Sequence, residues 1–251
     1  MFRAKKSLGQ NFLINPGVLD KIVTAAELDK NDIVIEIGPG KGVLTEKLAK
    51  EAGQVIAVEK DRRLIEELKE KFKNANVEII EEDILKLDIG KLLENSRYKV
   101  IGNIPYYITS HLLKTIFEKW PIPDFILLMV QKEVAQRITA KPPRMNLLAL
   151  SIQFYAELKI VSYVSRGSFR PMPKVDSAII KLTPRRQPRI KDRESRDMFF
   201  KLIKTAFAGK RKQLKNTLGL EVLEKADIKP KARPEELSMD DWISIINKSE
   251  I

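Results

Sequence analysis

Three segments of the chain end in residues whose types and spacing suit a bound nucleoside. The turn Gly38-Pro-Gly40 follows one apolar run, Glu59 follows a second, and Asp83 follows a third. Glycines allow the backbone to approach a ligand closely. A carboxylate 19 residues after Gly40 can accept hydrogen bonds from both hydroxyls of a ribose, and Asp83 can accept one from an adenine amino group. Together these residues predict a nucleoside-containing cofactor.

The glycine-rich turn alone does not select a ligand, because its spacing departs from the known phosphate-binding patterns. In the dinucleotide fingerprint a third glycine lies three positions after the second. Here that position is Val43, and the third glycine is Gly42. No Lys-Ser or Lys-Thr pair of a P-loop follows. The alternative is an ordinary turn between a strand and a helix, with surface acids beside it.

A second polar group, Asn103-Ile-Pro-Tyr106, follows the apolar pair Val100-Ile101. It brings a side-chain amide, the carbonyl of Pro105 and an aromatic ring into one short turn. Asn and Pro are also common in purely structural turns, but that interpretation does not account for Tyr106 and Tyr107 side by side. The group therefore indicates a second binding position beside the first.

Short apolar runs alternate with helical patterns between residues 30 and 140, which is typical of a parallel sheet covered by helices. The predicted strands are Ile33–Ile37, Val55–Val58, Val77–Ile80, Val100–Ile101 and Phe125–Val130, with helices at Thr45–Ala49 and Asp61–Phe72. Ile160–Val164 and Ser177–Leu182 are expected to form an antiparallel pair that closes the sheet. Because parallel strands end at one edge, the polar residues above are expected to converge there.

The composition changes near Thr183, where Pro184, Pro188 and several arginines predict a linker. Beyond it the pattern is helical, most clearly in Met198–Phe207. The sequence therefore predicts one domain over residues 1–184 and a small helical domain over residues 185–251.

Positive charge is concentrated in one segment. The whole chain carries +12, and residues 181–215 alone hold 13 Lys and Arg against three acids. Such a segment favours a polyanion partner, most often a nucleic acid. The alternatives are a solvated helix face and, more weakly, an anionic membrane surface, since no strongly apolar face accompanies the charge.

Composition also excludes several classes of protein. The chain has no cysteine, which rules out disulfides, Cys-ligated metals and thiol catalysis, and its one histidine, His111, leaves little for a metal site or a catalytic triad. No apolar run approaches the ~18 residues of a membrane span, and no secretory signal is visible. We expect a cytoplasmic protein that needs no metal.

The motifs resemble, in order, those of class I S-adenosylmethionine methyltransferases that act on exocyclic amines. Three further segments are similar to the rRNA adenine N6-dimethyltransferases in particular: Lys6–Leu13, Phe169–Ser177 and the basic segment Ala206–Asn216, read as helical. The nearest branch is the small-subunit enzymes linked to kasugamycin sensitivity. The resemblance implies a Rossmann-like α/β fold with a seven-stranded, mostly parallel sheet and a small C-terminal helical domain. One departure is Tyr107, where many relatives carry a smaller or polar residue.

The resemblance also implies roles for individual residues. Those expected to bind the cofactor are Asn11, Leu13, Gly38, Gly40, Glu59, Asp83 and Asn103. Asn103 and Pro105 are expected to accept the two hydrogens of the adenine N6, while Tyr106 stacks on the base. Those expected to contact RNA are Phe169, Arg211, Lys212 and Lys215. Three alternatives stay open: Asn11 as a helix cap, and Leu13 and Phe169 as core residues.

The implied activity is dimethylation of two adjacent adenosines near the 3′ end of small-subunit rRNA, with S-adenosylmethionine converted to S-adenosylhomocysteine and no metal. The expected partner is an immature small ribosomal subunit, bound by a monomer and without a membrane. The alternatives are the sister branch that methylates large-subunit rRNA, a non-catalytic RNA-binding or transcription factor, and a DNA adenine methyltransferase. Intact Asn103, Pro105 and Tyr106 favour catalysis, and no separate sequence-reading domain is visible.

Overall fold

The computed structural model describes residues 9–94, 96–209 and 212–248. The described residues divide into two compact units, the first taking in 9–135 and 159–184 and the second 136–158 and 185–248. The division differs from the predicted one in a single segment, 136–158, which joins the second unit. The reason is packing, because Met145, Leu150 and Phe154 are buried in the same hydrophobic cluster as Phe199 and Trp242.

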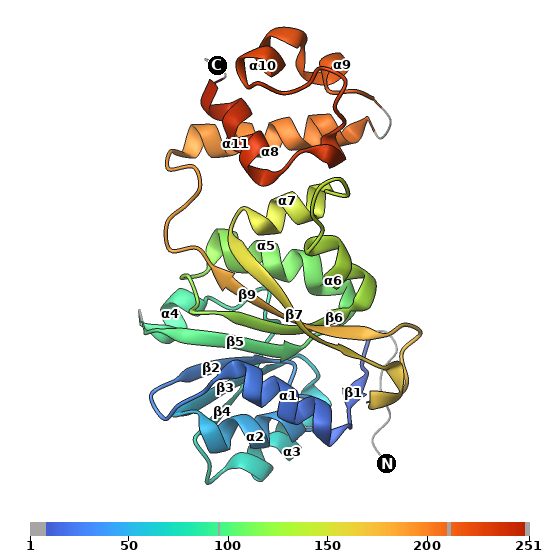
Figure 1. Ribbon diagram of the computed structural model, residues 1–251. Coiled ribbons are helices and arrows are strands. Elements are labelled where there is room, and N and C mark those ends of the chain that lie inside the picture. The colour runs from blue at the N-terminus through green and yellow to red at the C-terminus, as the bar shows by residue number, and fades with distance from the viewer. Residues whose placement is uncertain (1–8, 95, 210–211, 249–251) are drawn as a thin grey trace. The chain divides into compact units, whose positions relative to one another are not determined.

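A mixed sheet forms the centre of the first unit (Figure 1). Among the described residues it has seven strands, in the order β4-β3-β2-β5-β6-β9-β7. Their bounds are β2 Ile33–Ile37, β3 Gln54–Glu59, β4 Val77–Glu81, β5 Tyr98–Asn103, β6 Ile126–Gln131, β7 Ala156–Val164 and β9 Ser177–Pro184. Strands β2 to β6 run parallel, and β9 pairs antiparallel with β6. The predicted seven-stranded, mostly parallel α/β fold is confirmed.

Helices lie on both sides of this sheet, with α1, α2 and α3 on one side and α5 on the other (Figure 1). The helices that begin in this unit are α1 Pro16–Ala26, α2 Val43–Glu51, α3 Arg62–Phe72, α4 Ile89–Leu93, α5 Thr109–Lys119 and α6 Lys132–Ile138. Asn15 caps α1 by accepting a hydrogen bond from the N–H of Val18, and Pro16 occupies its first turn. None of the described helices is long and apolar enough to cross a bilayer.

Short elements join distant parts of the chain. Strand β1, Phe12–Leu13, pairs antiparallel with β8, Phe169–Arg170. Two further short elements are the 3₁₀ turns η2 at Tyr106–Ile108, before α5, and η3 at Arg166–Ser168, directly before β8. The β1–β8 pair brings the start of the described chain against a segment more than 150 residues later.

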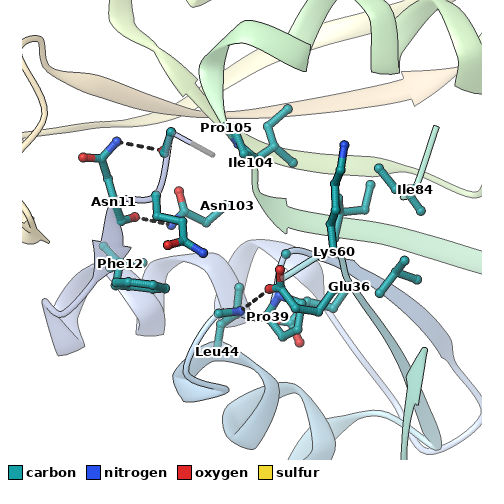
Figure 2. A pocket seen from close by; sticks show the side chains of 18 of the residues that line it. Asn11, Phe12, Glu36, Pro39, Leu44, Lys60, Ile84, Asn103, Ile104 and Pro105 are labelled. Atoms are coloured by element: carbon teal, nitrogen blue, oxygen red, sulfur yellow. Dashed lines mark hydrogen bonds between the residues drawn. The ribbon is translucent and has the colours of Figure 1, made fainter. Parts of the chain in front are cut away.

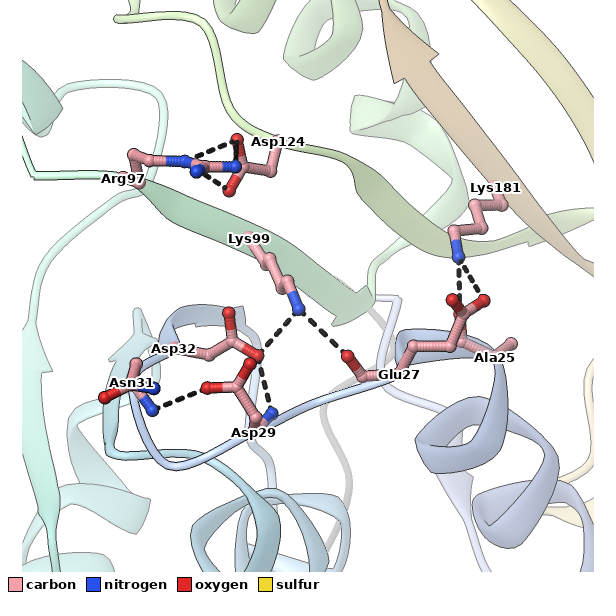
Figure 3. A network of polar contacts seen from close by, with 9 residues as sticks. All are labelled: Ala25, Glu27, Asp29, Asn31, Asp32, Arg97, Lys99, Asp124 and Lys181. Atoms are coloured by element: carbon pink, nitrogen blue, oxygen red, sulfur yellow. Dashed lines mark hydrogen bonds and ion pairs between the residues drawn. The ribbon is translucent and has the colours of Figure 1, made fainter.

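A polar network holds α1 at the edge of the sheet where the parallel strands begin (Figure 3). Lys99 of β5 donates to Asp32 (2.6 Å) and to the carbonyl of Glu27 (3.0 Å). Lys181 of β9 donates to the carbonyl of Ala25 and to the carboxylate of Glu27, both at 2.9 Å. The two lysines also lie over the ring of Phe125. This network of charged side chains therefore lies at the edge opposite the carboxyl ends of β2, β3 and β5.

The second unit is helical around an aromatic centre. Its helices are α7 Leu147–Gln153, α8 Arg193–Ala208, α9 Lys215–Leu218, α10 Leu220–Lys225 and α11 Met239–Lys248, with the 3₁₀ turn η4 at Pro234–Glu236. The rings of Phe154 and Phe199 stack with centroids 4.8 Å apart, and Trp242 is fully buried. The predicted helix around Met198–Phe207 is confirmed.

The expected basic helix over Ala206–Asn216 is wrong. Helix α8 ends at Ala208, and Gly209 follows as its C-cap. The N–H of Lys212 bonds to the carbonyl of Gly209, and α9 begins only at Lys215. Leu214, between the two helices, is fully buried, and its N–H bonds to the carbonyl of Ala232 rather than to a carbonyl of α8.

Candidate active site

One cavity of about 260 Å³ lies in the first unit, at the edge where β2, β3 and β5 end. Its walls include all the residues expected to bind a cofactor or to catalyse, namely Asn11, Leu13, Gly38, Gly40, Glu59, Asp83, Asn103, Pro105 and Tyr106. The structure therefore brings together side chains from the N-terminal segment, three strand ends and the turn after β5. Figure 2 shows part of this wall.

The turn between β2 and α2 forms the floor next to the N-terminal segment. The N–H of Gly38 donates to the carbonyl of Val58 at 3.0 Å, which ties the end of β2 to β3. Gly40 has φ +59, and a Cβ there would come within 2.9 Å of the Phe12 ring. Only glycine therefore lets Phe12 lie directly on this turn.

Glu59 is held as a buried acceptor at the end of β3. Its side-chain oxygens accept hydrogen bonds from the N–H of Gly40 (3.1 Å) and the N–H of Asp61 (2.8 Å). The residue is only 7% exposed, and burial raises the pKa of its carboxyl despite these bonds. The side chain is fixed, with further lone pairs left to accept hydrogens from a ligand.

Glu36 is a second buried carboxyl in the cavity wall, within the apolar strand β2. It is 2% exposed, and among the described residues its Oε2 has no hydrogen-bond partner. Burial raises its pKa to about 8, and the nearby negative charge of Glu59 adds to the effect. Such an orphaned oxygen indicates a missing donor or cation.

Asp83 follows β4 and is already paired. Lys60 Nζ lies 2.7 Å from its Oδ2, and the N–H of Leu85 donates to its Oδ1 at 3.1 Å. Burial alone would raise the pKa of Asp83, but these donors lower it below the ordinary value. The carboxylate is therefore ionised at neutral pH and keeps capacity for another donor.

The side chain of Asn103 faces the N-terminal segment (Figure 2). Its Nδ2 donates to the carbonyl of Asn11 at 3.1 Å, and the Asn11 side chain donates in turn to the carbonyl of Gly9. The first bond fixes the orientation of the Asn103 amide. Its Oδ1 has no hydrogen-bond partner among the described residues and can accept a hydrogen from a ligand. Asn11 is no helix cap in this structure, since Asn15 caps α1.

Pro105 and Tyr106 form the wall beside Asn103. The Pro105 carbonyl accepts the N–H of Ile108 at 3.1 Å, closing η2, and retains a second lone pair. The hydroxyl of Tyr106 lies 2.6 Å from Oγ of Ser177. Tyr107 also lines the cavity but is 64% exposed.

The residues expected to contact RNA do not gather at the cavity. Phe169 is 1% exposed in the hydrophobic core beside Leu13, its partner in the β1–β8 pair, so its burial leaves no face for a base. Lys212 is exposed and Lys215 is half-buried in the second unit, while Arg211 lies outside the described residues. His111 is exposed on α5 and does not line the cavity.

Residues 1–250 match the ribosomal RNA adenine dimethylase family. The chain belongs to this family. Its identity as a ribosomal RNA adenine dimethylase, and thus as a methyltransferase, agrees with the resemblance carried by the motifs.

Relatives of this dimethylase chain cover almost its whole length. Ribosomal RNA small subunit methyltransferase A of Dehalococcoides mccartyi (strain BAV1) is 48% identical over 96% of the chain and 86% of the relative. The protein of that name in Bacillus pumilus is 42% identical over 98% and 91%. A solved dimethyladenosine transferase from Plasmodium falciparum superposes with a TM-score of 0.78 at 30% identity, covering 93% of this chain and 95% of its own. The 23S rRNA methyltransferase ErmE gives 0.81 at 28% identity, covering 96% and 100%.

The dimethylase cavity also has lining residues that were not expected from the sequence, among them Phe12, Glu36 and Lys60. Glu36 carried a usable signal, because a lone acid inside the run Ile33–Ile37 must be buried. Phe12 stood within a recognised motif without a role of its own. Lys60 could not be identified as a site residue from the sequence, because a lysine that follows a strand is commonly a surface residue.

Proposed function

We propose that the chain transfers methyl groups from S-adenosylmethionine to N6 of two adjacent adenosines near the 3′ end of small-subunit rRNA during ribosome biogenesis. The observation that carries this proposal is the convergence of the glycine turn, Glu59, Asp83 and Asn103 on one cavity in a ribosomal RNA adenine dimethylase. The names of the relatives at 40–48% identity support the small subunit as substrate.

The cavity fits the cofactor chemically. Glu59 offers a buried carboxylate to the two ribose hydroxyls, and Asp83 offers one to the adenine amino group. Glu36 has an unpartnered buried oxygen for a cationic amino group, close to the turn where Gly38 and Gly40 leave room for a ligand. Leu13 and Phe12 close this side of the wall. The cofactor supplies an electrophilic methyl group on its sulfonium.

The chain's own residues would prepare the target amine. The lone pair of an adenine N6 is delocalised into the ring, which makes it a poor nucleophile. In the first transfer Oδ1 of Asn103 and the carbonyl of Pro105 would each accept one N6 hydrogen and so favour a tetrahedral nitrogen with a localised lone pair. In the second transfer one acceptor would hold the remaining hydrogen, and after each transfer the nitrogen would lose one proton to solvent while S-adenosylhomocysteine leaves. Tyr106 stacks on the base and keeps it out of the RNA helix. Positioning and electrostatics carry the reaction, and no metal is part of the proposal.

The substrate surface belongs to the proposal as well. Lys212 and Lys215, with Arg211, would meet phosphates of the immature small subunit. We propose that the protein acts as a monomer in the cytoplasm, where ribosome assembly supplies this substrate. Phe169 is left out of the RNA-contacting set because it is buried in the core.

A second candidate, methylation of large-subunit rRNA, is favoured by the likeness to ErmE. The identity to that protein is 28%, against 48% for the Dehalococcoides mccartyi small-subunit relative. We therefore place the small subunit first.

The test is transfer of labelled methyl groups to small and large subunits prepared from ribosomes that lack the modification. We expect label in the RNA of the small subunit. Label in the large subunit would identify the sister activity instead. Cofactor binding without transfer to either subunit would indicate a non-catalytic RNA-binding protein.

A further inference from the structure

The phenol of Tyr106 is anchored across the molecule by a side chain that does not line the cavity. The hydroxyl oxygens of Tyr106 and Ser177 lie 2.6 Å apart, although the residues are separated by 71 positions. Ser177 is fully buried. We propose that Ser177 is a positioning residue that fixes the ring of Tyr106 for stacking on the target base, an inference that rests on the proposed function.

The backbone alone cannot orient this ring. In η2 the N–H of Ile108 bonds to the carbonyl of Pro105 and the N–H of Thr109 to that of Tyr106. These bonds place the Cα of Tyr106, but its ring still rotates about two side-chain bonds. A hydrogen bond at the far end of the ring opposes rotation about the Cα–Cβ bond, so it fixes the direction in which the ring extends along the cavity wall, and a stacking ring must lie at a defined place.

Ser177 is a suitable fixed point because it is paired in the sheet and the residue before it is held by two hydrogen bonds. It begins β9, opposite Gln131 of β6. The preceding residue, Asp176, accepts the N–H of Lys132 on its carbonyl and the N–H of Arg166 on its carboxylate, both at 3.0 Å. A hydroxyl held in this way moves little, so the hydroxyl of Tyr106 is held in place relative to the central sheet.

The same segment holds the other half of the target site. Phe169 and Arg170 pair with β1, and the residue before β1, Asn11, accepts the amide of Asn103. The Phe169–Ser177 segment therefore ties together the stacking ring at one end and, through β1, the amide acceptor at the other. This gives the segment a role in the reaction although its only aromatic residue is buried.

The experiment compares Ser177→Ala and Tyr106→Phe, which remove the same hydrogen bond from either side, with the double variant. Methylation kinetics are measured on saturating small subunits, with cofactor affinity by calorimetry. We expect each single variant to lower kcat by roughly five- to tenfold, the scale of one neutral hydrogen bond. KM for subunits and cofactor affinity should stay unchanged. Ser151→Ala is the control for a general loss of stability, because among the described residues the hydroxyl that it removes bonds only to the Leu147 carbonyl of its own helix.

The double variant decides the matter. If the bond is what matters, the double variant loses no more kcat than either single one, and Ser177→Thr, which keeps a hydroxyl, restores most of it. If the kcat losses of the two single variants multiply in the double variant, or if Tyr106→Phe keeps full kcat, Ser177 does not position Tyr106. Tyr106→Phe carries this test even if Ser177→Ala does not fold. If the wild-type protein itself transfers no methyl group to small subunits, the proposed function has failed rather than this inference.

Discussion

The side-chain amide of Asn103 donates to the backbone carbonyl of Asn11, 92 residues earlier in the chain, at 3.1 Å. Asn103 ends β5 and Asn11 immediately precedes β1, so this bond closes the N-terminal segment over the end of the central sheet. It also decides which way the amide points. The orientation of the hydrogen-bond acceptor that the proposed chemistry needs is therefore set by Asn11 of the N-terminal segment.

Replacing Asn103 by Ala tests this acceptor. We expect turnover to fall by roughly 10²–10³, the scale for one positioned catalytic hydrogen bond, while cofactor affinity changes by only a few-fold. The matched control is Asn76→Ala, which also removes an amide that donates to backbone carbonyls, those of Ala52 and Gly53, but away from the cavity. Near-normal turnover of the Asn103 variant on saturating subunits would remove this residue from the mechanism.

Replacing Glu59 by Ala tests the ribose position. The ribose would lose a charged acceptor worth roughly 1.5–3 kcal/mol, so calorimetry should show the cofactor bound about 10- to 150-fold more weakly. Glu81→Ala removes a carboxylate at the end of the neighbouring strand β4 that does not line the cavity, and it should bind normally. Equal affinities in the two variants would show that Glu59 does not hold the ribose.

Glu36 predicts a pH-dependent stability. Burial raises its folded pKa to about 8 from 4.5. Because the folded state keeps the proton while the unfolded state loses it, stability falls as pH rises from about 4.5 to about 8. Glu36→Gln removes that dependence, so its melting temperature should gain several degrees on the wild type between about pH 5 and about pH 9, without cofactor. A gap between the two melting curves that is constant with pH would contradict a buried, protonated Glu36.

The basic segment is tested by changing Arg211, Lys212 and Lys215 together to Gln. Each lost phosphate contact lowers the slope of log K against log salt by roughly 0.7–0.9, so RNA binding across a salt series should flatten by roughly 2–3 units. Cofactor affinity should not change. A second triple variant, with Lys50, Lys69 and Lys73 changed to Gln, carries the same loss of charge on α2 and the α3 end. If both variants show the same slope as the wild type, RNA docks elsewhere.

The sheet could be predicted from the sequence because each of its central strands contains a short, largely apolar run. Ile33–Ile37 was expected with the bounds that β2 has, and the polar residues that follow the runs had to meet at one edge. The closing strand β9 was also expected, because four of the six residues of Ser177–Leu182 are apolar.

Pattern alone could not show which core an apolar segment joins. Leu150 and Phe154 look like any buried residues in the sequence, yet they pack with Phe199 of the second unit. Phe169 has the same ambiguity, since an aromatic residue in a motif suits a base and a core equally well. The bonds of Ser177 and Asn103 link residues too far apart in the chain for any local pattern to reveal them.

The proposed dimethylation of small-subunit rRNA is tested most directly by nucleoside mass spectrometry. Small-subunit RNA is analysed after reaction with the protein and S-adenosylmethionine, and the modified positions are then mapped. We predict N6,N6-dimethyladenosine at two adjacent positions near the 3′ end, and almost none with the Asn103→Ala variant. Unmodified small-subunit RNA after reaction with the wild-type protein, or methyl groups on atoms other than N6 of adenine, would contradict it.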